Sequence, residues 1–290
     1  QRQMCIRDSL VAPSMNVRMW LHPANQRNVS MLAQDGIRRV GPDEGDMACG
    51  EFGPGRMAEP TAILAAIQAM ISDGPLSGRH VLVTSGPTHE PIDPVRYLAN
   101  RSSGQQGNAI ASALAALGAR VTFITGPASA AAPLGVDVVP VQTAVEMLEA
   151  VKAAMPADAA VFAAAVADWR VTDAASGKIK KAAGSPPPSL SLAENPDILA
   201  TVAQMETGRP RLVVGFAAET DDVIENATQK RTRKGCDWIV ANDVSPETGI
   251  MGGQENAVTV IDETGAESWP RTSKEDVARK LAERIAAALG

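Results

Sequence analysis

The sequence predicts an α/β protein with a doubly wound, mostly parallel sheet. From residue 79 onward, short β-branched runs alternate with alanine-rich amphipathic patterns, and this alternation is typical of parallel sheets. Strands are expected at His80–Thr84, Arg120–Thr125, Ala159–Ala164, Arg211–Phe216, Asp237–Ala241 and Ala257–Asp262. Helices are expected at Gln105–Leu117, Ala144–Ala154, Pro196–Gln204, Val223–Lys234 and Ser273–Leu289. Polar motifs follow the strands, so a ligand is expected beyond their carboxyl ends.

Composition and charge narrow the classes of function. The chain has 290 residues, 45% of them hydrophobic, which suits one large or two modest domains. With a net charge of −6 and no basic tract, nucleic acid is not an expected partner. The 3 cysteines are too few for a disulfide framework, so a reducing cytoplasm is expected. No apolar run approaches the ~20 residues of a membrane span, so no membrane partner is expected.

The segment before residue 76 differs from the rest, and the stretch 72–78 has the composition of a linker. Residues 1–9 match nothing around them and do not begin with Met, so we interpret them as a truncated or spurious start. The expectations for the remainder are a strand end at Leu10–Ala12, a helix at Asn25–Asp35, an irregular stretch at Gly41–Met57 and a helix opened by Pro60.

The stretch Val81–Gly107 is the most informative part of the chain. A β-branched run stops at a Gly-Pro turn and is followed by a loop with three prolines, and then by a glycine-opened helix pattern. The polar and glycine residues of this stretch are Glu90, Asp93, Arg96, Asn100, Ser102, Ser103, Gly104 and Gly107. Because N–H groups at a helix start point at an anion, and glycine lets the anion approach, this stretch predicts the entrance of a nucleotide or phosphate site.

A second motif follows the strand expected at Ala159–Ala164. Small residues at a strand end let a base or sugar lie against the backbone, and the carboxylate of Asp168 suits a divalent metal on a triphosphate. Lys178, Lys180 and Lys181 supply cations for phosphate charge. The competing interpretation is a helix cap at Asp168 and a solvated lysine face.

Three weaker signals come later in the chain. Asn195 and Asp197 flank Pro196, which is a good helix-start pattern, and capping alone is the favoured interpretation on local grounds. Phe216, at a strand end, could stack on a base, although a place in the core explains it better locally. Lys230 and Lys234 share one helix face, where an anion between them or water alone would relieve their repulsion.

The first segment has two candidates of its own. Asn16 follows a proline turn among Met15, Met19 and Trp20, for which a packing patch is the alternative. Cys49 lies in a glycine-rich stretch near Arg56, where a thiol is better placed to react than a buried structural cysteine is.

Other classes of site are disfavoured. Histidine and cysteine show no metal-ligand spacing, and neither a P-loop nor a nucleophile elbow is present. A Rossmann-type NAD(P)-dependent reductase would need a G-x-G-x-x-G turn after the first strand, where this chain has S-G-P-T. A non-catalytic nucleotide-binding protein is the other alternative, but it would not need Asp168 and Lys178 together.

Taken in order, the motifs resemble a known family, the bifunctional phosphopantothenoylcysteine decarboxylase / phosphopantothenate–cysteine ligase of coenzyme A biosynthesis. The likeness covers about residues 10–290. P-S-M-N-V-R-M-W and A-C-G-E-F-G-P-G-R-M are similar to decarboxylase signatures. The ligase signatures are G-P-T-H-E-P-I-D-P-V-R, N-R-S-S-G, A-A-V-A-D-W-R, K-I-K-K, N-P-D-I, G-F-A-A-E-T and A-N-D-V.

The resemblance implies a C-terminal remnant of a flavodoxin-like flavoprotein domain at 10–75 and a Rossmann-like ligase domain at 76–290. The ligase would activate 4′-phosphopantothenate with CTP and Mg²⁺, giving an acyl-cytidylate that the cysteine amine attacks. Asn100 and Arg96 would bind the substrate, Lys178 and Asn100 would be catalytic, and Asp168 would hold the metal. The residues that the resemblance assigns to CTP are Phe162, Ala163, Ala164, Asp168, Lys178, Pro196, Asp197, Ile198, Leu199, Phe216, Lys230 and Lys234.

For the decarboxylase the resemblance implies FMN as cofactor, Asn16 as substrate-binding and Cys49 as proton donor. The family's flavin-binding region should precede residue 10, so this chain alone is expected to lack decarboxylase activity. A homodimer of the ligase domain is expected, and a higher oligomer only with a complete decarboxylase domain. The chain departs from the family at Gln105, which loses a cation at the helix start, while Arg101 keeps one.

Overall fold

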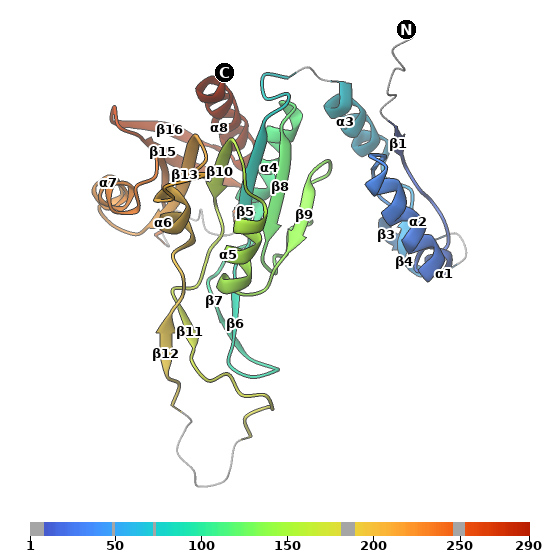
Figure 1. Cartoon of the computed structure of the whole chain (residues 1–290), viewed down its shortest axis with the longest axis horizontal. Helices are drawn as coiled ribbons and strands as arrows, with labels where there is room; N and C mark the ends of the chain where they lie inside the picture. Colours follow the sequence, from blue (N-terminus) through green and yellow to red (C-terminus); the bar gives the residue numbers. More distant parts are fainter. Residues whose placement is uncertain (1–8, 48–49, 72–73, 181–188, 246–252) are drawn as a thin grey trace. The chain divides into compact units, whose positions relative to one another are not determined.

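The computed structural model describes residues 9–290 except 48–49, 72–73, 181–188 and 246–252. It divides into two compact units, Gln1–Gly74 and Pro75–Gly290, which we describe separately (Figure 1). Within the described parts of the chain, no helix is both long and apolar enough to cross a bilayer.

The first unit consists of short strands and three helices in its described part. Its elements are β1 (Leu10–Val11), α1 (Val17–Trp20), α2 (Pro23–Gln34), β2 (Arg38–Arg39), β3 (Asp43–Asp46), β4 (Phe52–Arg56) and α3 (Pro60–Ile71). The expectation of an irregular stretch at 41–57 is wrong, because β3 and β4 form an antiparallel hairpin there. The two strands pair through backbone hydrogen bonds. Because they are rich in glycine, proline or charged residues, they lack the alternation of apolar residues from which a strand is predicted. At Gly55, a Cβ would lie 2.2 Å from the carbonyl oxygen of Met15, so only glycine fits.

The second unit is built on an 8-stranded sheet in the order β16-β15-β14-β13-β10-β5-β8-β9. Its strands are β5 (His80–Ser85), β8 (Arg120–Thr125), β9 (Asp137–Pro140), β10 (Ala159–Phe162), β13 (Leu212–Glu219), β14 (Trp238–Asp243), β15 (Glu255–Ile261) and β16 (Ala266–Ser273). All neighbouring pairs from β14 to β9 are parallel, whereas β15 and β16 add an antiparallel edge. The predicted doubly wound, mostly parallel sheet is confirmed, with its switch point between β5 and β10.

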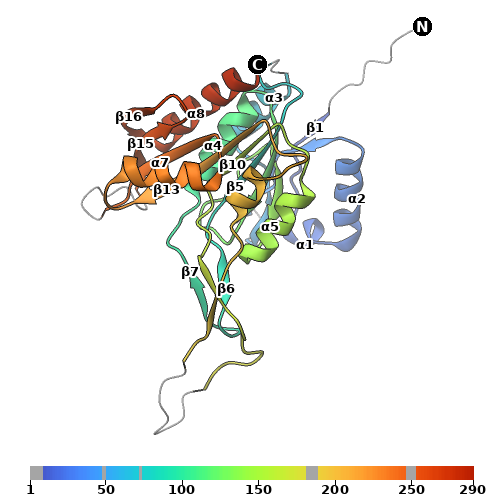
Figure 2. The same ribbon diagram turned by 60° about the vertical axis from the view of Figure 1, so that its left-hand side comes forward.

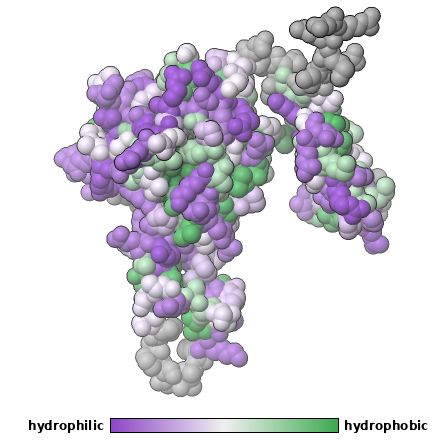
Figure 3. Space-filling view, in the orientation of Figure 1, coloured by the Kyte–Doolittle hydropathy of each residue, from purple (hydrophilic) through white to green (hydrophobic). Residues whose placement is uncertain are grey.

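Helices cover both faces of this sheet (Figures 1 and 2). They are α4 (Gln105–Ala116), α5 (Ala144–Ala153), α6 (Ile198–Ala203), α7 (Val223–Lys234) and α8 (Lys274–Leu289). One apolar cluster joins α4 and α8 to one face, and a second joins α5, α6 and α7 to the other. Every residue of β5 is buried, with Val81 and Val83 facing the first cluster and Leu82 facing the second. The exposed side of α7 is hydrophilic in Figure 3, as expected for a helix that buries only one stripe.

Two hairpins extend beyond the carboxyl ends of β5 and β10 and form what we call the arm, which comprises the described residues 87–100, 167–180 and 189–195 (Figure 2). The arm strands are β6 (His89–Pro91), β7 (Tyr97–Ala99), β11 (Trp169–Val171) and β12 (Leu192–Glu194). Each of the two hairpins is antiparallel. These strands were not predicted, because each is only three residues long, too short for a periodic pattern.

Several predicted boundaries move by a few residues. The strand expected to end at Phe216 continues to Glu219, and Asn242 and Asp243 belong to β14 and do not follow it. Helix α6 begins at Ile198, two residues after the predicted Pro196, because Asp197 is its cap. The strand expected to reach Ala164 ends at Phe162, although its pairing with β5 continues.

Candidate functional site

The start of α4 is packed closely against the end of β5. Gly104 caps the helix in the left-handed region, with φ of 77°, and Ser85 Oγ donates to its carbonyl at 3.1 Å. A Cβ on Gly107 would lie 2.3 Å from Ser85 Oγ, so this glycine is required for helix–strand packing. The hydroxyls of Ser102 and Ser103 accept from the Gly104 and Gln105 amides at 3.3 and 3.5 Å. Part of the predicted anion-binding helix start is therefore bonded to its own serines.

At the switch point, the ends of β5 and β10 are joined beyond the strands themselves. The Ala164 amide donates to Thr84 Oγ1 at 3.4 Å, and the Ala167 amide donates to Thr88 Oγ1 at 3.0 Å. The Ala165 amide also donates to the Gly86 carbonyl at 2.9 Å. The small-residue end of β10 is thus held in a fixed backbone path, which leads directly to Asp168.

Asp168 lies where three segments of the arm meet. Its carbonyl accepts from the Asn195 amide at 2.8 Å, and Asn195 Nδ2 donates to the Ala167 carbonyl at 2.8 Å. These bonds bring the predicted Pro196–Leu199 motif next to Asp168. The Asp168 carboxylate itself is exposed, and no other described residue bonds to it. It is therefore available to a ligand, and the alternative that it caps a helix is wrong.

Asn100 and Arg96 lie at opposite ends of β7 and bond to different segments. Asn100 Nδ2 donates to the Val166 carbonyl at 2.9 Å. Arg96 donates through Nε to Asp93 Oδ2 at 3.0 Å and through Nη2 to the Ile179 carbonyl at 2.6 Å. The Arg96 side chain is 47% exposed, and its remaining nitrogen, Nη1, makes no bond to the described residues. Lys178, next to Ile179, is also exposed and has no bond within the described chain.

The other predicted nucleotide residues lie on α6 and α7. Asp197 caps α6 by accepting from the Ala200 amide at 3.0 Å, as the capping interpretation predicts, and it also forms an ion pair with Lys234 Nζ. Burial lowers the pKa of Lys230, and so does the neighbouring Lys234, while Glu219 opposes the shift. Lys230 is therefore a partly desolvated cation whose charged form a ligand phosphate would stabilise.

Two aromatic side chains flank this region from opposite faces of the sheet. Phe162 is 7% exposed and belongs to the cluster beneath α5, α6 and α7. Phe216 is only partly buried and packs against the cluster beneath α4 and α8, together with Ala163. Leu199 fills the space above Gly215, where a Cβ would lie 2.6 Å from its Cδ2. Phe216 is thus a partly buried core residue within β13, and the expectation that it lies at a strand end is wrong.

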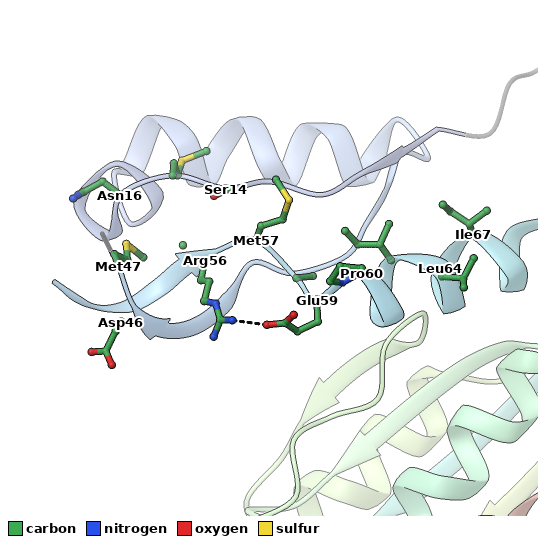
Figure 4. Close-up of a pocket in the computed structure, with 14 residues that line it drawn as sticks. Ser14, Asn16, Asp46, Met47, Arg56, Met57, Glu59, Pro60, Leu64 and Ile67 are labelled. Carbon is green, nitrogen blue, oxygen red and sulfur yellow. Dashed lines mark hydrogen bonds and ion pairs between the residues drawn. The ribbon is translucent and has the colours of Figure 1, made fainter. Parts of the chain in front are cut away.

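Of the two candidates in the first unit, the structure describes only Asn16. Asn16 caps α1 by accepting from the Arg18 amide at 2.8 Å, and its Nδ2 donates to Glu51 at 2.6 Å. It lines a cavity of about 910 Å³ together with Met15, Met47 and the start of α3 (Figure 4). Cys49 lies outside the described residues, as do residues 1–8 and Lys181.

Sequence reasoning missed the structural importance of Asp93 and Glu90. Asp93 is a buried carboxylate that accepts from the Val95 and Arg96 amides at 2.8 and 2.9 Å, and from the Ile179 amide at 3.1 Å. Glu90 is 1% exposed and accepts from the Ala144 amide, at the start of α5, at 2.9 Å. An Asp before a proline is a turn signal that could have identified the local bonds of Asp93. No sequence pattern indicates its bond to Ile179, 86 positions away.

A further polar network was also missed. Asn242 Nδ2 donates to Asn256 Oδ1 at 3.4 Å, and Asn256 Nδ2 donates to Gln106 Oε1 at 3.0 Å. Gln106 Nε2 in turn donates to the Lys274 carbonyl at 3.2 Å. This network joins β14, β15, α4 and α8 near the carboxyl edge. Asn242 therefore links several elements of the second unit.

Comparison with known proteins identifies the family. A family model described as "DNA/pantothenate metabolism flavoprotein C-terminal domain" matches residues 76–289, and one described as "Flavoprotein" matches residues 3–72. The coenzyme A biosynthesis bifunctional protein CoaBC of Vibrio parahaemolyticus is 42% identical over 95% of this chain and 69% of its own length. The chain belongs to this family of coenzyme A biosynthesis bifunctional proteins. The CoaBC protein of Escherichia coli is similar too, with 43% identity over 95% of this chain and 68% of its own length.

Solved structures agree with the CoaBC assignment. The crystal structure of a CoaBC C-terminal domain matches with a TM-score of 0.63 at 36% identity, covering 75% of this chain and 98% of that domain. A DNA/pantothenate metabolism flavoprotein from Streptococcus pneumoniae matches with a TM-score of 0.61 over 72% of this chain and 99% of its own. At 21% identity, the second comparison supports the fold alone.

Proposed function

We propose that residues 76–290 join cysteine to 4′-phosphopantothenate in a CTP-dependent ligase reaction. The relatives are coenzyme A biosynthesis bifunctional proteins, which supports a place in that pathway. One observation carries the proposal further. Hydrogen bonds tie Asn100 to the segment that leads into Asp168 at the base of the arm, and they tie the Lys178 segment to the turn at residues 92–96, while Asp168 and Lys178 keep their charged groups exposed.

The proposed reaction has two steps. A carboxylate oxygen of phosphopantothenate attacks the α-phosphorus of CTP, and pyrophosphate leaves with the bonding electron pair. The cysteine amine then attacks the acyl carbon, CMP leaves, and the amine gives up a proton as the amide forms. Negative charge builds on phosphate oxygens in the first step, where the unpaired ammonium group of Lys178 would stabilise it once the bound substrates exclude water.

The remaining residues would bind and orient the reactants. Asn100 and the free Nη1 of Arg96 would hold the phosphopantothenate and the acyl intermediate. The backbone at Phe162, Ala163 and Ala164 would take the nucleoside, next to Phe216. Lys230 and Lys234 would face the triphosphate with the Pro196–Leu199 segment. Since Asp197 already binds Lys234, Lys230 is the stronger candidate of the two for ligand charge.

Magnesium fits Asp168. Mg²⁺ is commonly held by one or two carboxylates together with substrate phosphates and water, so a single free carboxylate suffices. Within the described chain, no group of three or more His, Cys, Asp or Glu side chains could hold a metal without such help. When bound, the ion would neutralise triphosphate charge, and Asp168 would fix its position beside the nucleotide.

For the first unit we propose a part in the family's decarboxylase reaction, limited to substrate binding by Asn16. The cavity beside Asn16 offers methionine and aliphatic walls to a thiol-bearing chain. Its described lining does not fit the phosphate of FMN, because the one cation there, Arg56, is paired with Glu59 and Asp46 adds negative charge (Figure 4). We therefore derive no step through FMN, and the assignment of Cys49 stays a prediction.

A homodimer of the second unit is proposed as well. The arm carries Val95, Tyr97, Trp169 and Leu192, each at least half exposed, and hydrophobic side chains reach the surface along it (Figure 3). Exposed apolar side chains gathered on one projection are characteristic of an interaction surface.

The test is product formation with each nucleotide in turn. The protein is given phosphopantothenate, cysteine and Mg²⁺ with CTP, ATP or GTP, and pyrophosphate and phosphopantothenoylcysteine are measured. We expect both products with CTP, at a kcat/KM at least about tenfold above that with ATP. Equal rates with the three nucleotides would refute CTP specificity, and no ligated product with any of them would refute the ligase assignment.

A further inference from the structure

The segment that carries Lys178 has no regular secondary structure of its own. We call residues 173–180 the lysine loop; it follows β11 and includes Lys178 and Lys180. Three hydrogen bonds tie it to the turn at residues 92–96. The Ala175 amide donates to the Ile92 carbonyl at 2.9 Å, the Ile179 amide donates to Asp93 Oδ2 at 3.1 Å, and Arg96 Nη2 donates to the Ile179 carbonyl at 2.6 Å.

Asp93 is organised to hold this contact. Its side chain is 0% exposed. One oxygen accepts from the Val95 and Arg96 amides, while the other accepts from Arg96 Nε and the Ile179 amide. A buried carboxylate is costly unless donors of this kind compensate its charge. Burial alone raises the pKa of Asp93, but the amides of Val95, Ile179 and Arg96 and the Arg96 guanidinium lower it to about 2.

Both backbone polar groups of Ile179 are hydrogen-bonded to the turn at residues 92–96. Its amide is bound by the Asp93 carboxylate and its carbonyl by the Arg96 guanidinium, and these two groups are bound to each other at 2.7 Å. The planar fork of arginine fixes direction as well as distance. Lys178 is the residue directly before Ile179, so the path of the backbone at Ile179 sets where the Lys178 ammonium group can reach.

We propose that Asp93 and Arg96 are positioning residues that hold Lys178 in place through the backbone of Ile179. This inference rests on the proposed ligase function of Lys178. A misplacement of about 1 Å can cost on the order of 100-fold in rate, so a loop with no regular structure needs such an anchor. Arg96 then has two tasks, since Nη2 holds the loop while Nη1 stays free for the substrate.

The charge state of the anchor does not change under assay conditions. A carboxyl group whose folded pKa is about 2, below its ordinary 3.8, contributes stability above pH 3.8 that is lost as pH falls through 2. Protection of the Ile179 amide against hydrogen exchange, corrected for the intrinsic rate, should therefore stay constant between about pH 5 and 9.

The first experiment compares Asp93→Asn with Asp173→Asn, a matched loss of charge at an exposed carboxylate on the lysine loop itself. Hydrogen exchange of residues 175–180 is measured by mass spectrometry in each variant. We expect Asp93→Asn to increase exchange there by about tenfold or more, and Asp173→Asn to leave it unchanged. Unchanged exchange in Asp93→Asn would overturn the proposal. If that variant does not fold, Arg96→Lys, which keeps the charge but loses the fork, takes its place with the same expectation.

The second experiment is a double-mutant cycle on kcat for pyrophosphate release. We expect Asp93→Asn to lower kcat on the order of 10- to 100-fold in the otherwise unchanged protein, and to have no further effect beside Lys178→Gln. Equal fold-losses in the two backgrounds would show a general structural effect and overturn the proposal. A parent protein that releases no pyrophosphate would refute the proposed function, while the exchange experiment would still decide whether Asp93 holds the loop.

Discussion

The sheet body of the second unit and its arm are held together by different forces. All residues of β5 and β10 are buried, and apolar clusters on both faces carry the body. The arm strands are exposed or only partly buried apart from Glu90, and side-chain bonds to backbone from Thr88, Asn195, Asp93 and Arg96 keep the arm's segments together. The comparison teaches that stability resides mainly in the sheet body, whereas the candidate chemistry uses exposed groups of the arm together with the body residues proposed for CTP. Substitutions in the apolar core of the body should therefore lower the free energy of unfolding, whereas substitutions of exposed charged groups on the arm should lower enzymatic activity.

The largest effect is expected in the body, at Phe123. This side chain is 0% exposed on β8 and packs in the cluster beneath α4 and α8. Phe123→Ala leaves a cavity and should lower the free energy of unfolding by about 3–5 kcal/mol. Urea denaturation followed by circular dichroism measures it. Trp169→Ala, on the 55% exposed arm side chain, is the control and should stay within about 0.5 kcal/mol.

Lys178→Gln should lower enzymatic activity and leave stability unchanged. Loss of a cation that stabilises developing phosphate charge is expected to lower kcat by about 10²–10³-fold, while the exposed position keeps the unfolding free energy within about 0.5 kcal/mol. Lys152→Gln, at an exposed surface ion pair, is the matched control and should change neither quantity. A Lys178 variant with unchanged kcat would remove the catalytic assignment from the arm.

Glu90 lies at the junction between body and arm, so its substitution should modestly lower both the free energy of unfolding and kcat. The buried carboxylate accepts from the first amide of α5, where the helix dipole favours negative charge. Glu90→Gln should reduce the unfolding free energy by about 1–2 kcal/mol, since a neutral acceptor stays but the charge is lost. Denaturant unfolding beside Glu149→Gln, an exposed control, checks it, and equal values for both variants would contradict a role at the junction.

The smallest effect concerns pH. Because burial and the neighbouring Lys234 lower the pKa of Lys230, its ammonium group loses its proton at a lower pH than an exposed lysine does. The kcat/KM for CTP should therefore begin to fall on the alkaline side below the usual lysine range. Lys230→Arg, which keeps its charge, should extend the profile to higher pH. Superimposable profiles for the two proteins would exclude Lys230 from nucleotide binding.

The sheet body was largely predictable from the sequence, because buried strands and helices show characteristic patterns of apolar residues. The apolar run of β5 and the amphipathic patterns of α7 and α8 predicted the bounds of those elements to within a residue or two. The sequence drew attention to the glycines at the start of α4, but the main reason why glycine is required there was not predicted. Gly107 serves the packing of α4 on Ser85, a contact between segments that no single-segment pattern contains.

The arm was not predictable in the same way. Its strands are too short for a periodic signal, and the bonds that shape it join residues far apart in the chain, such as Asp93 and Ile179. In the first unit, the hairpin at 43–56 was missed because backbone pairing of glycines leaves no apolar alternation. The order of the motifs still located the candidate site, since each follows a strand whose carboxyl end lies at the same edge.

The central claim is that the exposed groups of the arm activate a carboxylate with a nucleotide before cysteine takes part. Rapid-quench measurement of pyrophosphate, with enzyme, CTP, Mg²⁺ and phosphopantothenate but no cysteine, tests it most directly. We predict a burst of about one equivalent of pyrophosphate per active site that requires both substrates and is absent from Lys178→Gln. Pyrophosphate that appears only after cysteine is added, or that does not depend on phosphopantothenate, would contradict the claim.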